Sequence, residues 1–448
     1  MSAQPETMTR HTTRWRGRLT AVRRNMTDAR ALNWTLLDQG LVSGVNFLTG
    51  IVLARCLGLE AFGRFSAVWL AISLAATLQM AMILAPMMSI GPQQNADDEP
   101  AYYGAALLQQ LIAALIGFIL LGLGAEALGR YAPQWGLTGL GLPIALTLVT
   151  CQLQEFLRRY FFTLRRYQAA FINDVLSYGS QAALLGAWIF APQAFGGPSL
   201  EAALWIIAAT SGLAAAVGLA SLTPMKIEEE FFWPAFRRNW RSARWLSGSA
   251  VLQWMSGSTL ILAAGWWLGP AAVGALKAAQ NIVGVAHILF NAFSNFIPVR
   301  LASLLRHRGA AAMSISLRRT TLLGAVGTLA LLAPAIVAPN ALMTLFYGAD
   351  FGQYAGVVIG FALTYGLAFF AQQLTFALRA MEEARPIFLG YLVTAAASVA
   401  LAWPLIHLMG LNGVAVGLVL LAGLNLATLW AGYRRARQAY LTKRQDMA

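Results

Sequence analysis

The feature that most restricts the fold of this chain is a series of apolar runs, each long enough to cross a lipid bilayer as a helix. Because a helix rises about 1.5 Å per residue, about 20 apolar residues cover the hydrocarbon core. The runs lie at about 34–54, 65–90, 104–128, 138–157, 171–191, 201–222, 246–268, 275–301, 319–338, 356–378, 387–406 and 413–433. We therefore predict an all-α polytopic membrane protein with about twelve transmembrane helices.

Composition supports a membrane location. Of the 448 residues, 58% are hydrophobic and 11% are charged, whereas a soluble domain carries about 25% charged residues. The net charge of +14 is spread over the connections between apolar runs, so we expect no nucleic-acid partner. The two cysteines, Cys56 and Cys151, lack the spacing of a metal site, and we expect neither a metal nor a cofactor.

The basic residues lie almost entirely on one side of the predicted membrane. If both termini are cytoplasmic, every Lys and Arg falls in a cytoplasmic segment except Arg55, Arg64, Arg130 and Lys277. Cytoplasmic loops are enriched in Lys and Arg, and a missed span would invert every later connection. The charge distribution therefore predicts cytoplasmic termini and an even number of spans.

The longest cytoplasmic connection divides the chain into two halves. We predict a cytoplasmic basic tail at 1–33, a six-helix lobe at 34–222, a cytoplasmic linker at 223–245, a second six-helix lobe at 246–433 and a cytoplasmic basic tail at 434–448. An internal repeat supports this division, because 57–63 and 268–274 both read L-G-x-x-A-x-G. The repeat indicates duplicated halves in parallel orientation, and its glycines suit tight turns.

One predicted span carries a stripe of polar residues along its length. Within the run 275–301 these residues are Lys277, Gln280, Asn281, His287, Asn291, Ser294 and Asn295. At about 100° per residue they fall within about 140° of arc on one face of a continuous helix. Lipid cannot satisfy such groups, so the face must meet other helices or a water-filled cavity. We favour a cavity wall, with interhelical hydrogen bonding as the alternative.

Polar residues of two other spans would meet the same interior. Asp38 and Asn46 lie on one face of the first span, and Gln253 lies on the seventh. Asp38 is a solvated residue near a helix end, an ion-coupling carboxylate or the partner of an arginine. His287 is a proton-coupling group or a neutral, hydrogen-bonded histidine.

Two arginines lie near the ends of this interior. Arg55 precedes the first outer turn, and Arg300 lies at the inner end of the eighth span. Arg55 either pairs with a headgroup phosphate or a carboxylate such as Glu60, or belongs to an anion site at the outer mouth. The second interpretation rests on the fit of a guanidinium to phosphate oxygens, and Arg300 would act in the same way at the inner mouth.

The sequence carries no catalytic signature. It contains no Walker A loop, no H-E-x-x-H motif and no paired cysteine motif, and the histidines are scattered. The predicted loops are too short for a nucleotide-binding domain. We therefore expect a protein that is not an enzyme and that does not hydrolyse ATP.

Three segments carry a family resemblance. The stretch 54–63 reads A-R-x-L-G-x-x-x-F-G within 40–65, and 345–351 and 411–415 contain two further turns, LFYGADF and LNGVA. In these segments the chain resembles the polysaccharide-repeat-unit flippases and O-antigen exporters of the multidrug/oligosaccharidyl-lipid/polysaccharide (MOP) superfamily. The resemblance implies two six-helix lobes around a central cavity, with alternating access.

The resemblance also implies a function and a location. The expected substrate is a lipid-linked oligosaccharide, moved from the inner to the outer leaflet of a bacterial cell membrane for cell-surface polysaccharide biosynthesis. Cationic cavity residues would meet its pyrophosphate and polar residues its sugars. Membrane lipids, a glycan polymerase and glycosyltransferases of the same pathway are the other expected partners.

Two other functions fit parts of the sequence. A small-molecule or drug:cation antiporter on the same fold would be expected to show membrane-embedded carboxylates, whereas Asp38, Glu155 and Asp174 lie near predicted helix ends. A membrane-embedded glycan polymerase or ligase would need a large outer loop with catalytic residues, and the longest predicted outer loop, 339–355, is poor in candidates. We therefore favour the flippase, with the antiporter as the alternative.

Overall fold

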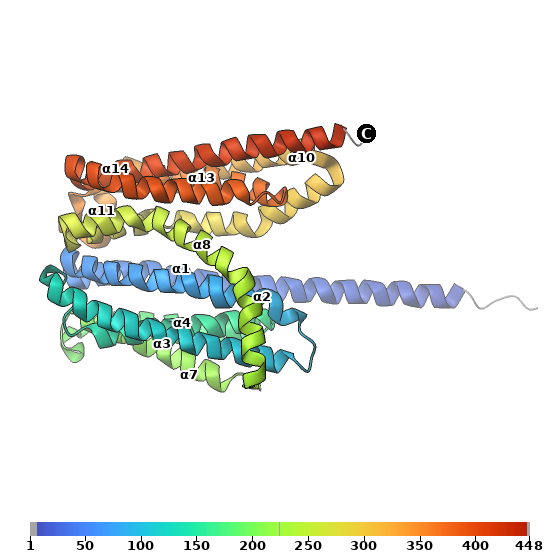
Figure 1. Ribbon diagram of the computed structural model, residues 1–448, viewed down its shortest axis with the longest axis horizontal. Helices are drawn as coiled ribbons and strands as arrows, with labels where there is room; N and C mark the ends of the chain where they lie inside the picture. The colour runs from blue at the N-terminus through green and yellow to red at the C-terminus, as the bar shows by residue number, and fades with distance from the viewer. Residues whose placement is uncertain (1–6, 224, 446–448) are drawn as a thin grey trace, which may run out of the picture.

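Long helices that run along one common direction make up the structure, a computed structural model (Figure 1). It describes residues 7–223 and 225–445, so the predicted terminal tails lie partly outside the described residues. The description also leaves out the side chains of 7–33, Leu36, Ser242, Ile288, Ala292, Asn295 and 443–445.

The first half of the chain contains α1 (Thr7–Gln79), η1 (Met80–Leu84), α2 (Ala85–Ile90), η2 (Gly91–Gln93), α3 (Glu99–Tyr131), η3 (Pro133–Trp135), α4 (Gly141–Thr163), α5 (Tyr167–Asp174), η4 (Val175–Gly179), α6 (Ser180–Phe190), η5 (Pro192–Phe195) and α7 (Leu200–Ala220). The second half contains α8 (Glu229–Leu268), α9 (Pro270–Val283), α10 (Ala286–Val337), α11 (Pro339–Tyr347), α12 (Ala349–Gly352), α13 (Ala355–Ala380) and α14 (Arg385–Gln445).

The helices provide twelve membrane spans within the described chain. Six stretches are long and apolar enough to cross a membrane on length and hydropathy alone. Three of them, in α1, α10 and α14, contain a kink at Gly58, Gly309 or Gly410 and hold two spans each. The other spans are α4, the segment α5–η4–α6 and α8, in which polar residues such as Gln152 lower the hydropathy. The predicted all-α, twelve-span fold is confirmed.

The spans form two lobes. In the first, α4 packs against α3 and α7, and α5 packs against α1; in the second, α13 packs against α10 and α14, and α14 packs against α8. Figure 1 shows the blue-to-green lobe below the yellow-to-red lobe, with the start of α1 and the end of α14 directed toward the same end of the molecule. We call this end the terminal face and the opposite end, which contains Gly58 and Gly269, the distal face.

The two repeat segments have the same backbone conformation at their turns. Gly58, between the first two spans, has φ 76° and ψ 174°, and Gly269, between α8 and α9, has φ 90° and ψ 174°. A positive φ is accessible to glycine without a steric penalty. The predicted tight turns at these glycines are therefore confirmed.

The lobes meet at the distal face through a close crossing of these segments. A Cβ atom on Gly63 would lie 1.8 Å from the Pro270 carbonyl oxygen, and one on Gly274 would lie 2.3 Å from the Leu59 carbonyl oxygen. Leu59 and Gly63 hold the same places in the first repeat as Pro270 and Gly274 hold in the second. The crossing is therefore a reciprocal pair of contacts around a pseudo-two-fold axis, and only glycine allows it.

The eighth span, predicted as one helix over 275–301, has one irregular turn, at which Gly284 and Val285 keep right-handed helical dihedrals. α9 ends at Val283 and α10 begins at Ala286, with a turn at Gly284 whose N–H donates to two carbonyls of the preceding turn, at 2.8 and 3.1 Å. α1 packs along α9 but makes at most isolated contacts with α10. The first and eighth spans are therefore held together in their distal halves only.

The connection between the lobes is mostly helical. α8 begins at Glu229, crosses the terminal end of the first lobe and continues into the seventh span (Figure 1). Asn239 is buried in this crossing, where its Oδ1 accepts from the Tyr102 hydroxyl at 3.0 Å and its Nδ2 donates to Gln109 at 3.1 Å. The stretch predicted as a linker, 223–245, is thus fixed to the first lobe.

Replacing Gly63 with alanine tests the crossing. The new Cβ would have to displace the backbone of Pro270, and overpacking of this kind costs typically about 1–3 kcal/mol. We expect Gly63→Ala to lower the free energy of unfolding by that amount, measured as a lower Tm of the purified protein. Gly124→Ala is the matched control, because nothing lies within 4 Å of its Cβ position. Equal Tm values for the two variants would contradict the crossing.

Candidate functional site

The polar stripe of the eighth span is divided between a packed part and an exposed part. Lys277 and Asn281 lie on α9 and are half-buried, whereas His287 and Asn291 lie on α10 and are exposed. The side chain of Asn295 lies outside the described residues. The irregular turn between α9 and α10 thus lies between half-buried residues and more exposed ones.

Asn281 on α9 forms hydrogen bonds to two other helices, α1 and α11. Its Nδ2 donates to the Tyr347 hydroxyl on α11 at 2.7 Å and to the Phe47 carbonyl on α1 at 3.2 Å. A Cβ atom on Gly50 would lie 2.6 Å from the same Nδ2, so α1 comes close at this point. At Asn281 the structure therefore shows the interhelical hydrogen bonding that was the alternative to a cavity wall.

Lys277 has only a neutral partner. Its Nζ donates to Oε1 of Gln280 at 2.8 Å, and it forms no ion pair with any carboxylate of the described chain. An ammonium group has three N–H donors, so two remain after this bond. Lys277 is therefore a positive charge inside the bundle that a negatively charged group could satisfy.

His287 is a hydrogen-bonded histidine. Its Nε2 lies 3.1 Å from the Tyr365 hydroxyl on α13, and the two rings meet edge to face with centroids 5.0 Å apart. The Tyr365 hydroxyl also interacts with the Gln280 side chain. Polar contacts therefore run from Lys277 through Gln280 and Tyr365 to His287 inside the second lobe. A role of His287 in proton coupling stays a prediction.

The other predicted interior residues lie near the boundary between the lobes. Asn46 is exposed on α1 and precedes Phe47, whose carbonyl accepts from Asn281. Gln253 is exposed on α8 and precedes Trp254, whose indole N–H donates to Ser73 of the first lobe at 3.0 Å. The residues next to Asn46 and Gln253 therefore contact the other lobe, and a role of the two amides in the interior stays a prediction.

The two arginines have different surroundings. Arg55 donates through Nε to the Phe346 carbonyl at 2.7 Å and through Nη2 to the Leu345 carbonyl. These carbonyls belong to the last turn of α11, where helix geometry leaves them without intrahelical partners. The suggested pairing of Arg55 with Glu60 was wrong, because Glu60 pairs with Arg64 at 2.6 Å.

Arg55 therefore joins the lobes at the distal face. Arg300 is exposed on α10, with its guanidinium carbon 5.9 Å from the centroid of the Phe296 ring. Its predicted role at the inner mouth stays a prediction.

Asp38 belongs to a buried ion cluster in the first lobe. It is 1% exposed, and its Oδ2 accepts from Nη2 of Arg158 at 2.6 Å. The Nε of Arg158 lies 2.6 Å from Oδ2 of Asp174, and Oδ1 of Asp174 accepts from Nε2 of Gln154 at 2.7 Å. The interpretation of Asp38 as a solvated residue was therefore wrong, and pairing with an arginine is confirmed.

The cluster contains more carboxylates than guanidiniums. Glu155 contacts Arg158 at 3.3 Å and Arg159 at 2.6 Å, so three carboxylates share two guanidiniums in the described structure. Sequence reasoning grouped Arg158 with the arginines that set membrane orientation and missed its role. The sequence did contain a signal for this pairing. Arg158 and Asp174 each lie near the end of an apolar run, where an unpaired charge is costly.

Comparisons with known proteins identify the sequence pattern and the fold. A family model described as polysaccharide biosynthesis protein matches residues 29–304. A search of curated proteins found no relative.

Several solved structures have similar folds. An inward-facing multidrug resistance MATE family transporter of the MOP superfamily matches with TM-score 0.73 at 17% identity, over 92% of this chain and 96% of that one. The lipid II flippase MurJ, in an inward closed conformation, matches with TM-score 0.71 at 10% identity, over 92% and 91%. A MOP superfamily transporter from Pyrococcus furiosus matches with TM-score 0.65 at 16% identity, over 92% and 95%. At these identities the likeness shows the fold, which is that of MOP superfamily transporters.

Replacing Arg158 tests the buried cluster. Arg158→Met would leave Asp38 and Asp174 buried without their cation, and breaking a buried pair in this way costs about 3–5 kcal/mol. We expect a correspondingly large fall in Tm in detergent. Arg159→Met is the matched control, because Arg159 is 33% exposed and its loss should cost about 1 kcal/mol or less. Equal Tm values for Arg158→Met and Arg159→Met would show that the cluster does not stabilise the fold.

Proposed function

This chain belongs to the polysaccharide biosynthesis protein family, and we propose that it flips a lipid-linked oligosaccharide, a polysaccharide or O-antigen repeat unit, across the membrane. The family match and the transporter fold support transport as the activity, in place of catalysis. The observation that carries the proposal is the polar stripe of α9 and α10, with Lys277 at its distal end donating to the neutral Gln280.

The chemistry of the stripe fits this substrate class. A lipid pyrophosphate carries negative charge, and the two remaining donors of Lys277 suit phosphate oxygens. Sugar hydroxyls both donate and accept hydrogen bonds, as do the amides of Asn46, Gln253 and Asn291, which are exposed. The interior therefore offers a cation for the head group and amides for the glycan.

The contacts at the distal face support alternating access. The lobes are joined there by the glycine crossing, by Asn281 and by Arg55, whereas α1 and α10 make at most isolated contacts toward the terminal face. An interior open toward the terminal face would load substrate there. Separation of the distal contacts, with approach of the terminal halves, would release it on the other side.

Two groups could couple transport to an ion. The cluster around Asp38 has one carboxylate in excess, and uptake of a proton or a monovalent cation would balance it. His287 is exposed and hydrogen-bonded to Tyr365, so it could accept a proton from the interior. Both remain coupling candidates.

Flipping by the purified protein tests the proposal. In proteoliposomes loaded with polyprenyl-pyrophosphate-linked oligosaccharide, we expect protein-dependent exposure of the glycan to an external glycan-modifying enzyme. Lys277→Ala should lower the flipping rate about tenfold or more, because a charge-assisted bond is worth about 1.5–3 kcal/mol. Asn291→Leu should lower the rate less, since it removes one neutral contact.

Lys226→Ala is the matched control, because Lys226 is exposed outside the stripe. All variants should reach the membrane in equal amounts. Normal flipping by Lys277→Ala and Asn291→Leu would remove the stripe from the mechanism. The antiporter alternative draws support from the MATE-like fold. Exchange of a cationic dye for protons without any glycan exposure would establish it instead.

The membrane orientation gives a separate prediction. The terminal face carries most of the basic residues, and we place it in the cytoplasm of a bacterial cell with both termini inside. A reporter fused after Gly352 should be active outside, and one fused after Met381 should be active inside. The reverse pattern in whole cells would refute this orientation.

A further inference from the structure

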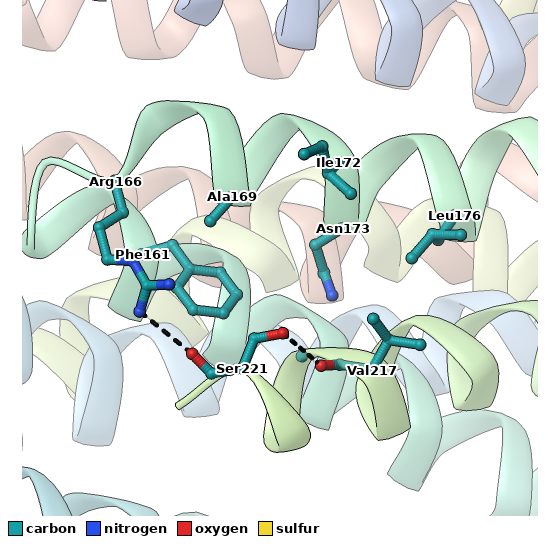
Figure 2. Close-up of a pocket in the computed structure, with 9 residues that line it drawn as sticks. Phe161, Arg166, Ala169, Ile172, Asn173, Leu176, Val217 and Ser221 are labelled. Carbon is teal, nitrogen blue, oxygen red and sulfur yellow. Dashed lines mark hydrogen bonds between the residues drawn. The ribbon is translucent and has the colours of Figure 1, made fainter. Parts of the chain in front are cut away.

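The first lobe carries an apolar groove that the proposed transport path does not use. The groove lies between α5–η4 and α7 and has a volume of about 120 Å³. Figure 2 shows Ile172 and Leu176 along one side and Val217 across from them, with Arg166 and Phe161 together at one end. We propose that this groove binds one anionic phospholipid, with its phosphate at Arg166 and part of an acyl chain along the apolar residues.

The Arg166 guanidinium is positioned by two contacts that leave most of its N–H donors available. Its guanidinium carbon lies 5.2 Å from the centroid of the Phe161 ring, and its Nη1 donates to the Ser221 carbonyl at the end of α7 at 3.1 Å (Figure 2). It forms no ion pair with a carboxylate of the described chain. A guanidinium has five N–H donors, and a phosphate can accept two of them in parallel.

The groove itself suits hydrocarbon. Ile172 is 57% exposed and Val217 is 40% exposed, so both lie on the outer surface of the lobe where lipid is the solvent. The one amide in the groove, Asn173, donates to the Ala214 carbonyl at 2.7 Å and accepts from Gln154 at 3.3 Å. Its polar atoms are therefore satisfied, and the groove offers an acyl chain an apolar surface.

The turn that presents Arg166 occurs twice in the fold with opposite charge. Arg165 has φ 57°, and the Arg166 N–H closes the turn on the Phe161 carbonyl at 2.8 Å. In the second lobe Glu382 has φ 62°, and the Glu383 N–H closes the same turn on a carbonyl of α13 at 2.9 Å. The backbone therefore belongs to the repeated fold, whereas two adjacent arginines are special to the first lobe and favour an anionic ligand.

The place of the groove favours a lipid over a soluble anion. Arg166 lies at the terminal face, and the groove extends from it into the membrane-spanning part of η4 and α7. Anionic headgroups lie at this depth in a membrane and are attracted by clustered Arg side chains. A soluble phosphate would use Arg166 and leave the apolar residues unused.

Lipid binding by the purified full chain tests the proposal. We expect phosphatidylglycerol, added to the protein in a neutral detergent, to raise the Tm in a saturable manner. Native mass spectrometry should show one retained molecule, and phosphatidylcholine should have no such effect. Arg166→Gln should weaken the apparent affinity about tenfold or more through the lost charge-assisted bonds. Val217→Phe should weaken it as well, by filling the groove while leaving the guanidinium in place.

The controls keep the two parts of the site separate. Arg237→Gln removes an exposed arginine elsewhere, and Val326→Phe enlarges a valine that is 69% exposed on α10, so both should bind as the wild type does. If Arg166→Gln fails to fold because the Ser221 carbonyl loses its donor, the lipid affinity of Val217→Phe still tests the proposal. Wild-type affinity in Val217→Phe, or an equal Tm rise with inorganic phosphate or phosphatidylcholine, would overturn the proposal.

Discussion

The close crossing of Gly63 and Gly274 is the contact on which the arrangement of the lobes depends. Between helices in lipid there is no hydrophobic driving force, so close backbone approach through small residues is a main source of association. The crossing brings α1 against α9, which places Asn281 beside the Phe47 carbonyl and Arg55 beside the last turn of α11. These contacts hold the lobes together at the distal face, whereas His287 and Asn291 of the stripe are exposed.

The two membrane-embedded cations Arg158 and Lys277 differ in the charge of their hydrogen-bond partners. Arg158 is surrounded by Asp38, Asp174 and Glu155, so its charge is fully used within the first lobe. Among the described residues, the side chain of Lys277 donates only to the amide oxygen of Gln280. A cation that is saturated by the protein stabilises a lobe, whereas one with donors to spare is available to a ligand. This difference, more than the number of charges, distinguishes the saturated Arg158 from Lys277, which is available to a ligand.

Pseudo-symmetry in this protein fixes the backbone and leaves the side chains free to differ. Gly58 and Gly269 share a conformation, and so do Arg165 and Glu382, although the latter pair carries opposite charge. A duplicated fold must repeat its turns, because the turns set helix directions. It need not repeat the chemistry that those turns present. The two lobes can therefore take different roles, with one carrying the buried ion cluster and the other the polar stripe.

The twelve spans, the tight turns at Gly58 and Gly269 and the presence of a polar stripe can all be predicted from the amino-acid sequence. These follow from hydropathy, glycine placement and helical periodicity, which are local properties of the chain. Only the tertiary structure decided that Asp38 pairs with Arg158, 120 residues away, and that Arg55 binds the end of α11 in the other lobe. It also shows that Asn281 hydrogen-bonds to α1 and α11, whereas His287, on the same polar stripe, is exposed. Such contacts between distant residues depend on which helix ends lie next to each other. The apolar runs between them do not specify this arrangement, because apolar residues fit many packings equally well.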